Sequence, residues 1–173
     1  GSHHVRYSGG GQTLRLSTDA PIIFILEETA FHLDRPLAFF FGPDERMATP
    51  IAETARDFIE KTVGYWQQLS GRLHVPFEWQ DAVIRSAITL KLCSFEESGA
   101  IIASPTTSLP EADGEGRNWD YRFNWVRDSY FVVRALNRIG YIETMTDYLV
   151  YLDNLVAKSP DGWLQPVFGI ATE

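Results

Sequence analysis

Twelve consecutive residues, Arg117–Asp128, combine four aromatic rings, three arginines and two carboxylates. A sugar site needs this mixture, because rings cover the apolar faces of a pyranose while Arg and Asp side chains bind its hydroxyls as donors and acceptors. A packed core would use the rings, but every charge buried with them would have to be paired. The run therefore indicates carbohydrate binding.

Arg127 and Asp128 are adjacent at the start of a predicted helix. Asp128 begins a stripe that continues through Val132, Ala135 and Ile139, so its carboxylate is expected at the mouth of the buried side. Spacing alone also fits a second interpretation, in which Asp128 stabilises the helix dipole and Arg127 pairs with a neighbour.

Hydrolysis of a glycosidic bond with inversion requires two carboxyl groups, an acid and a base, roughly 6.5 to 9.5 Å apart. By residue type, the candidates are Glu78, Glu96, Glu97, Glu111, Asp120 and Asp128. The sequence contains neither a Gly-x-Ser-x-Gly elbow nor a phosphate loop, and its His and Cys spacing does not suit zinc. Neither a metal nor a cofactor is therefore expected.

With the preceding segment Gly99–Glu111, the run resembles the entrance to the catalytic barrel of glycoside hydrolase family 15. This family comprises glucoamylases, glucodextranases and some trehalases. The resemblance extends through Val75–Ala82 and Leu164–Ile170, and so covers nearly all of the chain after about residue 50. Where bacterial members commonly read Tyr-Cys-Trp-Leu-Arg-Asp-Ala, residues 123–129 read Phe-Asn-Trp-Val-Arg-Asp-Ser.

The resemblance implies roles for four side chains of the motif. Arg127 and Asp128 would hold hydroxyls of the non-reducing glucose at the innermost subsite. Tyr121 would lie against the catalytic base and the attacking water, and Trp125 would line the same subsite. For both of these aromatic residues, packing in a core is the alternative.

Four further residues belong to the implied site. Trp119 is a member of the motif, as is Asp120, which could instead cap the following helix. Gln165 and Pro166 would form part of the subsite rim, and a plain turn is an equal alternative there. The six candidate acids do not match the catalytic glutamates of the family, which lie in later helices and loops. The chain is therefore expected to hold no catalytic residue and to be inactive alone.

The segment 1–48 reads as β structure. Leu14 and Leu16 alternate with polar residues, Pro21–Leu26 is rich in β-branched and aromatic residues, and Pro36–Phe41 is a short apolar run. Gly9-Gly10-Gly11 predicts a turn. The whole segment is expected to be the end of an antiparallel β-sandwich, because three strands with one solvent-exposed face do not form a stable sandwich by themselves.

The remainder reads as helix. A linker helix and its connection are predicted over 49–77, starting at Thr49-Pro50 and ending at Ser70-Gly71. Its Trp66 lies on an apolar stripe, which favours core packing over sugar binding. From Trp79 to Phe95 the pattern is apolar nearly all round, as in a helix buried on several sides. Two more helices are predicted over about 123–138 and 142–157.

The fold class is therefore predicted as a mixed fragment, mainly α. Residues 78–173 would form the first part of an (α/α)6 barrel, which needs twelve helices and at least ~150 residues. Only three or four helices follow Phe77, so the barrel is incomplete and its remainder is an expected partner. The resemblance implies a glucoamylase-like parent that releases glucose from the non-reducing end of α-glucans with inversion. A trehalase of the same family and a non-catalytic sugar-binding protein are the alternatives.

Composition excludes several other classes. The net charge of −8 argues against nucleic acid and anionic membranes as partners, whereas a neutral sugar is not repelled. A single cysteine, Cys93, cannot form an internal disulfide and is expected to be buried. Without an apolar run of roughly 20 residues or a signal peptide, a cytoplasmic location is the expectation. Gly1-Ser2-His3-His4 reads as a cloning remnant or native sequence, not as a metal site.

Overall fold

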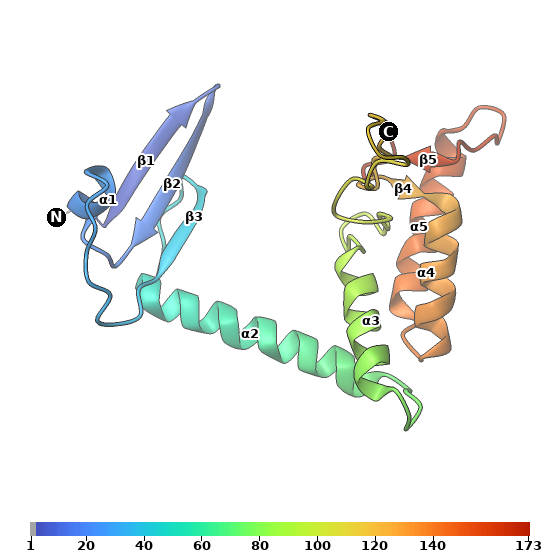
Figure 1. Ribbon diagram of the computed structural model, residues 1–173, viewed down its shortest axis with the longest axis horizontal. Helices are drawn as coiled ribbons and strands as arrows, with labels where there is room; N and C mark the ends of the chain where they lie inside the picture. Colours follow the sequence, from blue (N-terminus) through green and yellow to red (C-terminus); the bar gives the residue numbers. More distant parts are fainter. Residues whose placement is uncertain (1–2) are drawn as a thin grey trace. The chain divides into compact units, whose positions relative to one another are not determined.

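The computed structural model describes residues 3–173, so Gly1 and Ser2 of the suspected cloning remnant lie outside it. The chain divides into two compact units: the first ends at Tyr65 and the second comprises Trp66–Glu173. An antiparallel sheet and several helices are present, as predicted (Figure 1). The predicted domain boundaries stay predictions.

The elements are β1 (His4–Gly9), β2 (Gln12–Thr18), α1 (Ile22–Leu26), β3 (Phe39–Pro43), α2 (Ile51–Arg72), α3 (Gln80–Leu92), β4 (Asn124–Trp125), α4 (Val126–Arg138), α5 (Glu143–Lys158) and β5 (Val167–Phe168).

The first unit contains a three-stranded sheet in which β2 lies between β1 and β3 (Figure 1). A two-residue turn joins β1 to β2, with Gly10 at φ 58° and Gly11 at φ 78°. Positive φ at both central residues is the geometry that suits the right-handed twist of a hairpin and favours glycine. The predicted turn and the predicted strand around Leu14 and Leu16 are therefore confirmed.

The predicted strand over Pro21–Leu26 is wrong, because Ile22–Leu26 form the short helix α1. A run of five apolar residues does not by itself distinguish a strand from a helix. Both edges of β2 are already occupied, by β1 and by β3, so residues 21–26 have no place beside it. The third strand is instead β3, which begins at Phe39, within the apolar run predicted from Pro36.

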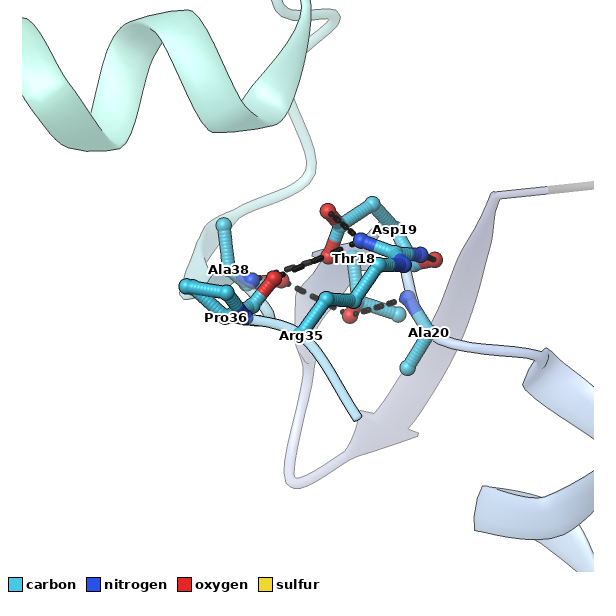
Figure 2. Close-up of polar contacts among 6 residues, drawn as sticks. All are labelled: Thr18, Asp19, Ala20, Arg35, Pro36 and Ala38. Atoms are coloured by element: carbon cyan, nitrogen blue, oxygen red, sulfur yellow. Dashed lines mark hydrogen bonds and ion pairs between the residues drawn. The ribbon is translucent and has the colours of Figure 1, made fainter. Parts of the chain in front are cut away.

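Polar contacts connect the two ends of the segment between β2 and β3 (Figure 2). The Thr18 hydroxyl donates to the carbonyl of Ala38 (2.8 Å), and the Ala38 amide donates to the Asp19 carboxylate (2.8 Å). The Arg35 guanidinium donates to the same carboxylate (2.9 Å). The Ala38 amide, followed by Arg35, lowers the pKa of Asp19. These bonds hold the end of β2 and the approach to β3 together although the two are distant in sequence.

In the second unit the predicted helices are confirmed as α3, α4 and α5. Gly140, at φ 84°, follows the end of α4 as predicted. α4 and α5 lie side by side (Figure 1). One apolar cluster joins them to the segment after α3 and consists of Ala100, Ile101, Tyr148, Tyr151 and Leu155. A second cluster joins α4 to α3 and to the end of α2 and consists of Leu69, Leu73, Ala87 and Leu136.

Trp66 packs against the second cluster, which confirms its predicted core role. Helix α3 is less enclosed than its apolar sequence predicts: Ala87 and Lys91 are its buried residues, whereas Leu92 is exposed. The Lys91 ammonium is 2.8 Å from a carboxylate oxygen of Glu96 and lies over the ring of Tyr141. Cys93 is buried as predicted, and burial raises its pKa. Within residues 3–173, every helix is too short or too polar to cross a bilayer.

Candidate functional site

The motif is carried by two segments that run antiparallel ahead of α4. The Ala103 amide donates to the Phe123 carbonyl (3.2 Å), and the Ser104 amide donates to the Tyr121 carbonyl (2.9 Å). Further along, the Ser108 amide donates to the Trp119 carbonyl (2.8 Å). This irregular hairpin fixes the backbone of the motif without a long strand.

Trp125 lies at the centre of an aromatic cluster. Its ring contacts Trp119 edge-on, with centroids 5.9 Å apart, and Tyr121 in the same way at 6.2 Å. The indole N–H of Trp125 donates to the Asp120 carbonyl (3.0 Å). Trp119 donates its own indole N–H to Glu111 and is 43% exposed. The structure thus brings the three predicted aromatic residues together, partly packed and partly open to solvent.

Asp120 does not cap the following helix, because its carboxylate is bound to Arg122. The Arg122 backbone amide and Nε donate to Oδ1 (both 3.0 Å), and Nη2 donates to Oδ2 (2.7 Å). The guanidinium, followed by the backbone amide, lowers the pKa of Asp120 to about 2. A carboxyl group held ionised in this way cannot act as a general acid near neutral pH.

Arg127 and Asp128 lie in the first turn of α4, as predicted. Arg127 Nη2 is 3.3 Å from Asp128 Oδ2, and the two side chains are 77% and 39% exposed. The interpretation in which Arg127 pairs with a neighbour therefore describes the observed contact. An ion pair this exposed contributes at most about 1 kcal/mol to stability. The role of the pair in sugar binding stays a prediction.

The segment of Gln165 is held against the start of α4. β5 pairs with β4, placing Val167 opposite Trp125, and the Val126 amide donates to the Pro166 carbonyl (3.1 Å). From α5, the Tyr151 hydroxyl donates to the Gly169 carbonyl (2.7 Å). The structure thus brings the exposed Gln165 close in space to the motif, although the whole of α4 and α5 separates them in sequence.

Two buried polar residues, one within the motif and one directly after it, were missed by the sequence reasoning. Asn124 and Ser129 are buried and hydrogen-bond to each other and to the carbonyl of Ile101. The available signal was the motif itself, because these are two positions at which it departs from the common bacterial pattern.

The remaining acidic candidates lie apart from the aromatic cluster or are engaged by neighbours. Glu96 pairs with Lys91, and Glu111 lies 3.5 Å from Arg117 besides accepting from Trp119. Glu78 and Glu97 are exposed. Among the described side chains, His, Cys, Asp and Glu residues do not form a group of three or more that could hold a metal ion.

A comparison with protein families matches residues 79–173 to the model of glycosyl hydrolases family 15. The matched range contains the aromatic cluster, the Arg127–Asp128 pair and the Gln165 segment.

Several curated proteins are similar to the chain and are named trehalase. One from Thermoplasma volcanium is 36% identical over 112 residues, which is 65% of this chain and 18% of the relative. One from Mycolicibacterium smegmatis is 36% identical over 125 residues, 70% of this chain and 19% of the relative. Trehalase 2 of Sulfolobus acidocaldarius is 36% identical over 110 residues. The chain thus spans less than a fifth of the length of these relatives. No solved structure matches it significantly.

Proposed function

This chain belongs to glycosyl hydrolase family 15, and from that membership we propose that the full-length protein is a trehalase whose innermost glucose subsite is built in part by this segment. The observation that carries the proposal is the 36% identity to proteins named trehalase in archaea and a mycobacterium. The same names favour trehalose over the α-glucan substrate of the glucoamylase-like interpretation.

The reaction is hydrolysis with inversion. The bond between one anomeric carbon of trehalose and the bridging oxygen breaks, and the oxygen of water bonds to that carbon from the opposite face. A carboxylic acid gives its proton to the bridging oxygen, and a carboxylate takes a proton from the water. We place this pair of carboxyl groups in the later part of an (α/α)6 barrel, of which α3, α4 and α5 would be the first helices.

The segment would contribute binding groups for one glucose ring. Arg127 and Asp128 would bind hydroxyls as donor and acceptor, and the partly open cluster of Trp119, Tyr121 and Trp125 offers the apolar surface that a pyranose covers. Gln165, two residues before Val167, which pairs with Trp125, would complete the rim.

The test uses the full-length protein with trehalose and with maltotriose. We expect glucose release from trehalose, with one β-glucose and one α-glucose formed per molecule when the products are followed by proton NMR before they mutarotate. Hydrolysis of maltotriose but not of trehalose would point to a glucoamylase. Binding of trehalose without hydrolysis would point to a non-catalytic sugar-binding protein, the remaining alternative.

A further inference from the structure

Asn124 and Ser129 are tied to one backbone carbonyl beneath the motif. Asn124 Nδ2 lies 2.8 Å from the Ile101 carbonyl and 2.8 Å from Ser129 Oγ, and Ser129 Oγ donates to the same carbonyl at 3.1 Å. Asn124 is 0% exposed and Ser129 is 1% exposed. A carbonyl can only accept, so the nitrogen of the Asn124 amide must face Ile101. Both N–H groups of that amide are therefore used.

Tyr148 of α5 packs in the same apolar cluster as Ile101, whose carbonyl accepts these bonds. Asn124 Oδ1 and the Tyr148 hydroxyl are buried and lack hydrogen-bond partners among residues 3–173. Burial raises the pKa of Tyr148, and the side chains of Ser129 and Asn124 act against that rise.

The start of α4 needs such a restraint. Its N-cap residue, Trp125, makes no capping hydrogen bond through its side chain. Arg127 and Asp128 lie between Asn124 and Ser129 in sequence, so the bonds to Ile101 hold both ends of the short stretch that carries them. An exposed ion pair would not by itself fix the direction of these two side chains.

We infer that Asn124 and Ser129, both bonded to the Ile101 carbonyl, form a buried polar lock that positions Arg127 and Asp128 for the sugar. The lock acts through the helix start and touches no substrate, and its members are positioning residues. The inference rests on the proposed function, because it assigns the lock to the subsite of that function.

The first experiment measures kcat/KM of the full-length protein for trehalose. We expect Asn124→Ala to lower kcat/KM roughly tenfold, because it releases the helix start and leaves Ser129 short of a partner. In an Asp128→Asn background the same change should have little further effect, since the positioned group is already lost. Ser129→Ala is the milder second variant and should behave alike. Asn137→Ala, on the exposed face of the same helix, is the matched control and should match the wild type.

The second experiment, amide hydrogen exchange of the full-length protein, requires no activity. Asn124→Ala should reduce protection of residues 130–133, whose amides bond to the carbonyls of the first turn of α4, by at least about tenfold. The centre of α5 should be unchanged, and Asn137→Ala should leave both regions unchanged. Unchanged protection at 130–133 would overturn the lock. Equal losses of kcat/KM in both Asp128 backgrounds would make Asn124 a general structural residue and overturn the positioning role. A wild-type protein that hydrolyses no trehalose contradicts the proposed function instead, and exchange alone then decides whether the lock holds the helix start.

Discussion

Arg127 and Asp128 contact each other at the surface of the described chain, and this contact contributes little to folding. Both side chains keep most of their hydrogen-bonding capacity for a ligand: the distance between them is 3.3 Å, a single contact, and Arg127 is 77% exposed. When a residue contributes to binding and not to folding, its substitution should lower kcat/KM and leave the melting temperature unchanged.

Asp128→Asn should therefore lower kcat/KM for the preferred sugar by roughly tenfold or more, since a charge-assisted hydrogen bond in a dry pocket contributes about 1.5 to 3 kcal/mol. Arg127→Lys should also lower it, because an ammonium cannot reproduce the planar two-pronged contact of a guanidinium. The melting temperature of both variants should stay close to that of the wild type. Kinetics and thermal melts of the same preparations provide the measurement.

The opposite pattern, reduced melting temperature with near-normal kcat/KM on folded protein, would show that the pair only stabilises the helix. Unchanged kcat/KM in both variants would remove the substrate-binding assignment.

The composition of the motif was sufficient to predict the side chains that meet in space, but not how they are held. Trp119, Tyr121 and Trp125 are close in sequence, and their type alone favours a common surface. The buried bonds of Asn124 and Ser129 depend on Ile101, which lies well before the motif in the chain, and local sequence carries no signal for a partner so distant.

At the scale of elements, the connection between α3 and the motif depends on one tight turn at Gly99. Gly99 has φ +77°, and a Cβ at this position would lie 2.1 Å from the backbone oxygen of Asp147 in α5. Backbone cannot move aside as a flexible side chain can. The turn therefore requires glycine for two independent reasons, the positive φ and the close approach of the Asp147 backbone. Asp147 lies one residue before Tyr148, so a shift there would also disturb the first apolar cluster.

Gly99→Ala should lower the free energy of unfolding by more than the roughly 1 to 2 kcal/mol that a left-handed conformation costs an alanine. Gly114→Ala is the matched control, because Gly114 has φ +79° but nothing lies within 4 Å of its Cβ position. The difference between the two variants in denaturant-induced unfolding of the full-length protein isolates the steric contribution. Equal destabilisation would mean that α5 yields to the added methyl group.

The elements themselves were predicted unevenly, for a physical reason. α4 and α5 have long apolar periodicities and are followed by Gly140 and Gly162, and α3 lies in a long apolar run; all of these are local properties of the sequence. α1 has five residues, too few for a period, and both edges of β2 are occupied by β1 and β3. Which strands occupy those edges is not a local property of the sequence.

At the scale of the whole molecule, large apolar side chains remain exposed on several helices. Phe58 and Ile59 on α2, Phe131 on α4 and Val150 on α5 are all more than half exposed. Patches of this kind mark surfaces that other parts of a protein cover. We propose that the later helices of the barrel cover those of α4 and α5.

The isolated chain, residues 1–173, should therefore associate and bind a hydrophobic dye, while the full-length protein should do neither. It should also release no glucose from trehalose, because we place the acid and base carboxyl groups in the later part of the barrel. Size-exclusion chromatography with light scattering, together with a glucose assay, measures both. A monomeric chain with a cooperative thermal transition would contradict the association, and glucose release abolished by changing one of its own carboxylates would contradict the placement of the catalytic pair.

The short pairing of β4 with β5 has a consequence for recombination between related genes. Val167 faces Trp125, and the Pro166 carbonyl accepts from Val126, so backbone positions from the two sides of the α4–α5 helix pair make up one contact surface. A recombination event between two related genes that falls between these positions would join halves shaped for different partners. Crossovers after Ile170 would keep the surface intact. Segments 124–126 and 165–168 should consequently be exchanged together when chimeras are made from members of this family.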